Sequence, residues 1–161
     1  MPQVLKDNCV VNDSWTTLSE DSETLPNGDI LLSYNQWQTL SDQIQNHNGS
    51  IGVVIEGNAE IEEIIEPLLG LPLIAINFPK FADGRGFSAA SLIRERYNYS
   101  GEIRAVGGFM RDQLYLLSRC GFNAFKFDNT VDLTDSAKSL QDFSETYQVS
   151  ADQENPLFRR R

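Results

Sequence analysis

The chain alternates short, mainly apolar runs with longer stretches in which apolar residues recur every three or four positions. The runs lie at residues 29–34, 51–55, 73–78, 102–106 and 122–127. A continuous apolar run of this length is typical of a strand buried on both faces, whereas the wider spacing is typical of an amphipathic helix. The alternation predicts about five strand–helix units and therefore an α/β fold with a mostly parallel sheet.

The helices between these strands are predicted to begin at polar residues that can cap a helix N-terminus. The fourth helix, residues 109–119, is expected to end at Gly121, because glycine readily adopts a left-handed backbone. The final helix is expected to carry Leu140, Phe143 and Tyr147 on one face. The expected caps are Asn35, Asn58 and Ser88 for the first three helices and Thr134 or Ser136 for the last.

Both ends of the chain differ from this regular pattern. Residues 4–18 contain two short apolar runs separated by a turn signal, which predicts a small N-terminal hairpin. Residues 1–150 are interpreted as one domain, and residues 151–161 as a polar C-terminal tail. A complete eight-fold barrel typically needs about 250 residues. A chain of 161 residues therefore leaves an open sheet or a partial barrel.

The composition of the chain excludes several classes of binding partner. The formal net charge of −10 argues against binding to nucleic acid or to an anionic membrane, because an acidic surface repels phosphate. No apolar stretch approaches the roughly 20 residues that a membrane helix needs, and the N-terminus does not resemble a signal peptide. A cytoplasmic location is therefore expected.

Metal and cofactor motifs are not evident in the sequence. Cys9 and Cys120 are far apart, and a single histidine, His47, cannot complete a cluster or structural zinc site. Neither G-x-G-x-x-G nor the phosphate-loop pattern is present. The expectations are therefore no metal and no cofactor, with Cys120 as a buried structural thiol and His47 at the end of a helix.

The turns that follow the third and fourth apolar runs form the candidate site. In parallel α/β sheets, ligands bind beyond the carboxyl ends of the strands. Arg85 lies between two glycines, and an arginine can hold a planar anion with two hydrogen bonds. The amides of Ala89, Ala90 and Ser91 are expected to point toward the same region. The candidate ligand-binding residues are Lys80, Asp83, Gly84, Arg85, Gly86, Arg104, Gly107, Gly108, Arg111 and Asp112.

A purely structural role for these residues is the alternative. Asp83 and Arg85 can pair within a tight turn, and Gly107-Gly108 can serve close packing of a helix on a strand. A salt-bridged network is equally compatible with the charges, and it would join Glu102, Arg104, Arg111 and Asp112.

Four motifs in the second half of the chain resemble those of a bacterial family, domain of unknown function 934. They are DGRGFSAASLIR at 83–94, GEIRAVGG at 101–108, RDQ at 111–113 and RCGF at 119–122. The resemblance covers most of the chain and is clearest at residues 73–128. Gly108 stands where the family pattern leads us to expect an acidic residue.

The resemblance implies a bacterial cytoplasmic protein that is often encoded beside sulfite reductase in assimilatory sulfate reduction. It favours an accessory or interaction protein of sulfite reductase. The alternative is a small enzyme or binding protein for a sulfur oxyanion or phosphate at the D-G-R-G and G-G turns. The resemblance transfers no reaction and no catalytic residue.

Overall fold

The computed structural model describes residues 2–80, 83–128, 130–141, 150–152 and 155. Within this part of the chain, an eight-stranded sheet has the strand order β2-β1-β8-β7-β6-β5-β4-β3. The neighbours from β3 to β8 are parallel, and β1 pairs antiparallel with both β2 and β8. The strands are β1 (Gln3–Lys6), β2 (Cys9–Asn12), β3 (Thr16–Thr17), β4 (Ile30–Ser33), β5 (Ile51–Glu56), β6 (Leu73–Phe78), β7 (Glu102–Gly107) and β8 (Ala124–Phe127).

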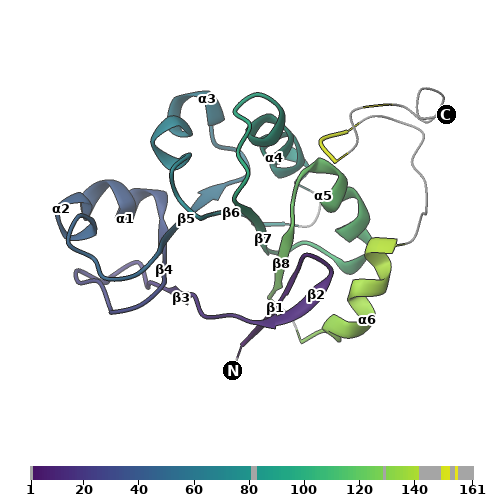
Figure 1. Ribbon diagram of the computed structural model, residues 1–161, viewed down its shortest axis with the longest axis horizontal. Helices are drawn as coiled ribbons and strands as arrows, with labels where there is room; N and C mark the ends of the chain where they lie inside the picture. Colours follow the sequence, from purple (N-terminus) through teal and green to yellow (C-terminus); the bar gives the residue numbers. More distant parts are fainter. Residues whose placement is uncertain (1, 81–82, 129, 142–149, 153–154, 156–161) are drawn as a thin grey trace.

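The helices lie in an arc around the outer face of the curled sheet (Figure 1). Each parallel strand is the spatial neighbour of the one before it, so every crossover advances in the same direction and places its helix on the same face. The fold is therefore a curled half-barrel, which confirms the α/β prediction and selects the partial barrel. The helices are α1 (Tyr34–Thr39), α2 (Ser41–Ile44), α3 (Ile61–Ile64), α4 (Arg85–Glu95), α5 (Leu114–Cys120) and α6 (Leu133–Lys138), with 3₁₀ turns at Glu66–Leu68, Arg111–Gln113 and Ser139–Gln141.

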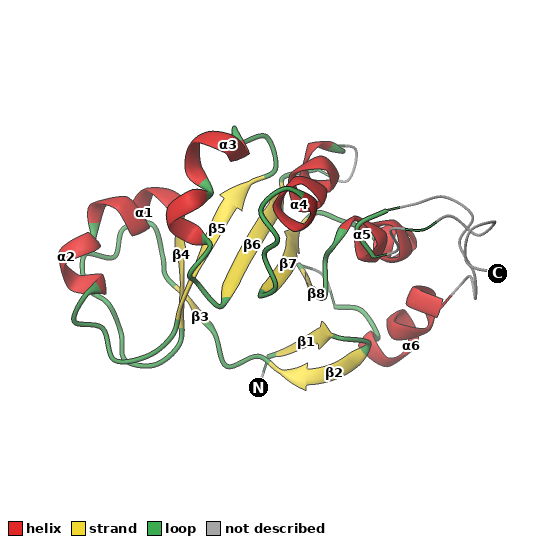
Figure 2. Ribbon diagram, turned by 45° about the horizontal axis from the view of Figure 1, so that its top comes forward, coloured by secondary structure: helices red, strands yellow, loops and turns green. Residues whose placement is uncertain are grey.

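The predicted N-terminal hairpin is confirmed as β1 and β2. Asp7 and Asn8 form its turn with positive φ angles of 47° and 65°, which asparagine and aspartate tolerate better than most residues. The hairpin extends the sheet beyond β8, and α6 packs beside it (Figure 2).

The short connection between β2 and β3 requires a strongly curled sheet. These strands lie at opposite edges, and in a flat eight-stranded sheet the edges would be about 34 Å apart. The four residue steps from Asn12 to Thr16 span at most about 14 Å. The connection therefore crosses the open side of the curl, and we call residues 13–15 the strap.

The two faces of the sheet bury different sets of residues. On the outer face, Phe78 is the centre of an aromatic group, with ring centroids 5.6 Å from Phe87, 6.3 Å from Phe109 and 5.7 Å from Phe122. On the inner face, Leu31, Leu73 and Ala75 are buried against Trp15 of the strap. The strap thus supplies the inner face with a cover that the helices cannot provide.

Several predicted helix starts are wrong, although the helices themselves exist. Ser33, and not Asn35, caps α1, because the Gln36 side chain three residues later completes a capping box with Ser33. This first helix also breaks at Leu40 into two short helices, α1 and α2.

The other helices also begin at residues that differ from the predicted caps. Glu60 precedes α3 in place of Asn58, and Asp132 caps α6 through the Asp135 amide at 3.0 Å. Gly121 does end α5, with a φ of 116°. Phe143 and Tyr147, predicted on the last helix, lie outside the described residues. In the described part of the chain, no helix has the length and apolarity needed to cross a membrane.

Candidate functional site

The two candidate turns lie at the same rim of the half-barrel. They follow β6 and β7, which are parallel neighbours with Phe78 opposite Gly107. The helix after β6 begins earlier than predicted, with Gly84 as its N-cap and Arg85 as its first residue. Arg85 and Gly86 are therefore helical, and the amides of residues 89–91 lie in the second turn and not at the free end of α4.

Arg85 forms an ion pair with Asp83 of its own turn. Its Nε and Nη2 atoms donate to the two carboxylate oxygens at 2.9 and 2.7 Å, and the Arg85 amide also donates to Asp83. These hydrogen bonds lower the pKa of Asp83 to about 2. The Arg85 side chain is 64% exposed, so it faces solvent while Asp83 occupies two of its nitrogens.

A cavity of about 270 Å³ lies between the first turns of α4 and the segment that follows β5. Arg85 and Ser88 line one side, and the backbone of Gly57 lies on another. The lining is mixed in character, since it includes the apolar Ile61 and the acidic Glu60. An anion bound here would meet Arg85 but would also lie near carboxylates.

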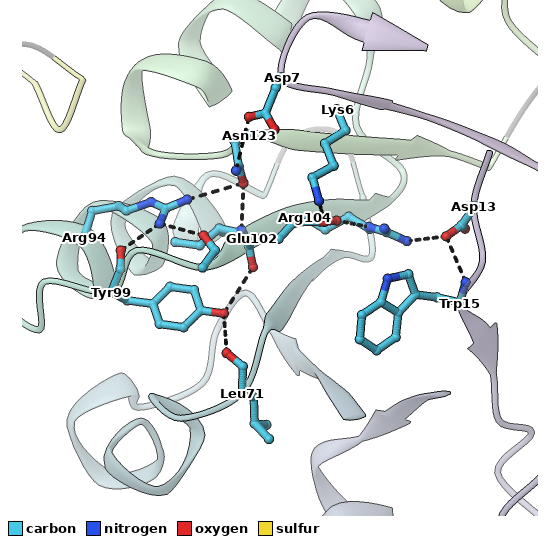
Figure 3. A network of polar contacts seen from close by, with 12 residues as sticks. Lys6, Asp7, Asp13, Trp15, Leu71, Arg94, Tyr99, Glu102, Arg104 and Asn123 are labelled. Carbon is cyan, nitrogen blue, oxygen red and sulfur yellow. Dashed lines mark hydrogen bonds and ion pairs between the residues drawn. The ribbon is translucent and has the colours of Figure 1, made fainter. Parts of the chain in front are cut away.

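Arg104 lies away from the rim, in the middle of β7 on the inner face, and only 2% of its side chain is exposed. It donates to Glu102 at 2.7 Å and to Asp13 at 2.9 Å. Lys6 pairs with the other oxygen of Glu102, and Lys126 with the other oxygen of Asp13. These five charges alternate in sign across the inner face, and Figure 3 shows the part from Lys6 to Asp13.

Burial and the neighbouring positive charges shift the pKa of Asp13 in opposite directions. Burial raises the pKa of this carboxyl, but its contacts with Lys126 and Arg104 outweigh burial and hold the pKa below its ordinary value. Asp13 is therefore a buried carboxylate that two cations keep ionised. This role belongs to the strap and was not foreseen, because nothing in the local sequence around Asp13 marks it as buried.

Arg111 is bound to the C-terminal elements. It donates to Ser139 Oγ at 2.9 Å and to the side chain and backbone of Asp135, and these bonds join the Arg111–Gln113 turn to α6. The alternative of one network that joins Glu102, Arg104, Arg111 and Asp112 is confirmed only for Glu102 and Arg104. Arg111 belongs to a separate group of contacts with Ser139 and Asp135. Arg111 and Asp112 line a hollow of about 400 Å³ that does not include Arg85.

The glycines at the rim serve close packing. Gly107 has a φ of 92°, and an added Cβ would lie 2.5 Å from the Phe78 carbonyl oxygen. A Cβ on Gly86 would lie 2.6 Å from the Phe78 ring. Gly108 donates its amide hydrogen to the Phe78 carbonyl at 2.6 Å. Lys80 is exposed at this rim, and Gly84 has open space around it.

Sequence reasoning missed three polar residues that face inward at the carboxyl ends of the strands. Asn77 donates its side-chain amide to both oxygens of Glu56, at 3.0 and 3.2 Å. Lys126 holds the strap through Asp13, with the nitrogen and oxygen 2.9 Å apart. The two-residue periodicity of each strand could have placed these side chains on the inner face, but only the strand order shows that they are neighbours.

The two residues set aside as structural, Cys120 and His47, have these surroundings. Cys120 is partly buried, and burial raises the pKa of its thiol. His47 Nε2 lies 2.7 Å from the carbonyl oxygen of Gly28. Within the described residues, no group of three or more His, Cys, Asp and Glu side chains is arranged to hold a metal ion.

Comparison with protein families identifies the relatives of the chain. The model of a family described as a bacterial protein of unknown function, DUF934, matches residues 52–158, which is more than half of the sequence. The chain belongs to the DUF934 family. The match confirms the resemblance inferred from the motifs. No curated protein matches the chain.

The DUF934 match begins in β5. The hairpin, the strap, β3 and β4 therefore lie before the matched segment, although Asp13 of the strap contacts Arg104 within it. The family description assigns no reaction and no ligand.

Proposed function

We propose that this DUF934 protein is an accessory protein of assimilatory sulfite reduction that acts by binding sulfite reductase. The association with sulfite reduction comes from the family resemblance. The supporting observation in the structure is that the motif arginines bind their own protein. Arg85 pairs with Asp83, Arg94 donates to backbone carbonyls, Arg104 pairs with Glu102 and Asp13, and Arg111 pairs with Asp135.

These contacts favour a role for the motifs in shaping the surface of the protein. An arginine that already has an intramolecular partner must break that contact, or share it, before it can bind a substrate. Two of these arginines also join helices, since Arg94 of α4 bonds to Gly121 at the end of α5 and Arg111 bonds to Asp135 of α6. A rigid surface with preset side chains lowers the entropic cost of binding a protein partner.

The partner-facing surface is proposed to include Met110 and Leu116. These are the most exposed of the large apolar side chains in the described residues, at 49% and 58%, and both lie in or next to the segment of Arg111–Gln113 and α5. Apolar side chains, methionine among them, are enriched in the buried centres of protein interfaces.

Co-purification from the native host tests the proposal. Sulfite reductase should be retained by the tagged protein, and a strain that lacks the protein should show reduced sulfite reductase activity. Met110→Asp and Leu116→Asp should weaken retention, whereas Val11→Asp, on the exposed edge strand β2, should not. Absence of sulfite reductase from the purified complex, together with normal activity in the deletion strain, would contradict the proposal.

A second candidate function is the binding of a small oxyanion in the cavity beside Arg85. The observation in its favour is that Arg85 and Ser88 line this cavity at the first turns of an 11-residue helix. Sulfite, sulfate or phosphate should then raise the melting temperature. The increase should be lost in Arg85→Ala and enlarged in Asp83→Asn, which releases the guanidinium from its internal partner. An unchanged melting temperature with all three anions would exclude this candidate.

A further inference from the structure

The inner face of the half-barrel is closed in its middle and open at the carboxyl ends of the strands. In the middle, Leu73, Ala75 and Arg104 are buried beneath the strap. Toward the carboxyl ends, the inward-facing side chains become partly or fully exposed. We call this open end the inner mouth. It consists of Val54, Glu56, Asn77, Val106 and Lys126.

Strand register brings four of these residues into a single layer. Glu56 lies opposite Asn77, Asn77 opposite Val106, and Val106 opposite Lys126. Glu56 and Lys126 are therefore three strand spacings apart, about 14 Å along the sheet and less across the concave side of a curl. By strand alternation both side chains lie on the inner face, beside an apolar floor that Val54 and Val106 share with the buried inner cluster.

The polar groups of the inner mouth are held in place by intramolecular contacts. Each of them can still form further hydrogen bonds with a ligand. The Lys126 ammonium has three N–H donors and contacts Asp13 Oδ2 at 2.9 Å, and its side chain is 33% exposed. The Glu56 carboxylate accepts from Asn77 with both oxygens but has further lone pairs and is exposed. A fixed cation and a fixed acceptor thus flank an apolar floor, as is common in ligand sites.

The position of Lys126 is set by the residue beneath it. The Asp13 side chain is fully buried, and its Oδ2 atom lies 2.9 Å from the Lys126 ammonium. This ion pair occupies the buried side of the ammonium and leaves its remaining N–H donors for the exposed side. The inner mouth therefore has a cation whose position is fixed before a ligand binds.

We propose that the inner mouth binds a small organic acid that also carries a hydroxyl or amino group. The acid group binds the Lys126 ammonium, and the hydroxyl or amino group donates to Glu56. The short carbon skeleton lies over Val54 and Val106. This site is separate from the Arg85 cavity and from the surface that contains Met110, so it extends the function proposed above.

Titrations followed by nuclear magnetic resonance of backbone amides test this site with matched probes. Glycolate and L-serine carry the acid and the donor, whereas acetate carries the acid alone. Glycolate and L-serine should shift the amides of Val54, Asn77, Val106 and Lys126, and acetate should bind more weakly. Loss of one hydrogen bond to a charged group corresponds to roughly a ten- to hundredfold change in affinity.

Variants separate this proposal from the others. Lys126→Met should abolish binding of all three probes, and Lys126→Arg should retain it because a cation remains. Glu56→Ala should remove the preference for glycolate over acetate, and Arg85→Ala should change nothing. The amide spectra of the variants without probe establish that each is folded. Shifts confined to residues near Arg85, equal shifts in Lys126→Met, or no shift with any probe would overturn the proposal.

Discussion

The guanidinium of Arg104 donates a 2.9 Å hydrogen bond to Asp13, a residue 91 positions earlier in the chain. Arg104 belongs to β7 in the middle of the sheet, and Asp13 belongs to the strap between the two edge strands. The hydrogen bond therefore links the strap, which crosses the open side of the curled sheet, to the central strand β7. It also joins the N-terminal segment to a strand that lies within the family match.

Removing the carboxylate of Asp13 should strongly destabilise the fold. Asp13→Ala leaves Arg104 with Glu102 alone and leaves Lys126 without its buried partner. Breaking a buried ion pair by removing one partner typically costs about 3–5 kcal/mol. Urea unfolding should show this loss. Glu62→Ala, which breaks an exposed pair with Arg96, is the control and should cost less than about 1 kcal/mol.

The stability contribution of Asp13 should depend on pH in the acidic range. The pKa of Asp13 is lower in the folded protein than in the unfolded chain, where it is about 3.9. Its stabilisation is therefore complete above about pH 4 and disappears as the pH falls through the folded pKa. The gap in unfolding free energy between wild type and Asp13→Asn should narrow below pH 4. A gap that stays constant down to pH 2 would contradict this assignment.

Arg94 should be more important for stability than its position on a helix suggests. It donates to the carbonyl oxygens of Gly121, Tyr99 and Gly101 at 2.9, 2.7 and 2.8 Å, and Figure 3 shows its contacts with Tyr99 and Asn123. Arg94→Lys cannot reproduce this planar set of donors, and each buried acceptor left unpaired costs about 1–3 kcal/mol.

We expect Arg94→Lys to lose on the order of 3 kcal/mol in chemical unfolding. The exposed neighbour Arg96 provides the matched control, since Arg96→Lys should change the unfolding free energy by less than about 0.5 kcal/mol. Equal effects of the two substitutions would indicate that the Arg94 contacts contribute little.

Gly107→Ala should destabilise the protein, whereas Gly84→Ala should be tolerated. A Cβ at Gly107 meets the Phe78 carbonyl and the Asn77 side chain, and the positive φ adds backbone strain. The two effects together suggest a cost of about 2–4 kcal/mol. Gly84 has a φ of −81° and no atom within 4 Å of an added Cβ. Thermal unfolding of the two variants should separate them clearly.

The two cysteines should differ in their reaction with a thiol reagent. Cys9 is exposed, whereas Cys120 is partly buried and burial raises the pKa of its thiol. Because Cys120 has a smaller fraction of thiolate and is less accessible to the reagent, its alkylation should be slower. Partial labelling with iodoacetamide at pH 8, followed by peptide mass spectrometry, should find modified Cys9 well before modified Cys120. Faster labelling of Cys120 would show that its surroundings open in solution.

The local patterns that predicted the strands were more reliable than those that predicted helix starts. The strand predicted at residues 73–78 matches β6 at both ends, because Pro72 and Pro79 flank the run and proline interrupts a strand. Ser88 was a plausible cap for α4, yet the helix begins at Arg85, where Asp83 accepts a hydrogen bond from the Arg85 amide. Competing caps close in sequence cannot be ranked without the surrounding contacts.

The candidate site was predicted in part. The sequence placed Arg85 and Gly107 after adjacent strand–helix units, and the structure has both at one rim. It could not show that Arg104 points into the curl or that Arg111 bonds to α6. Nor could it group Glu56 with Asn77 and Lys126, which come from different strands.

The sequence by itself determined the alternation of strands and helices, the hairpin and the family, since each of these depends on neighbouring residues or on short motifs. Tertiary structure alone decided the order of the strands, the curl of the sheet and the partners of the buried charges. These depend on contacts between segments far apart in the chain, such as Asp13 with Arg104. No local pattern encodes such a contact, because its energy arises only when the sheet closes and removes both charges from water.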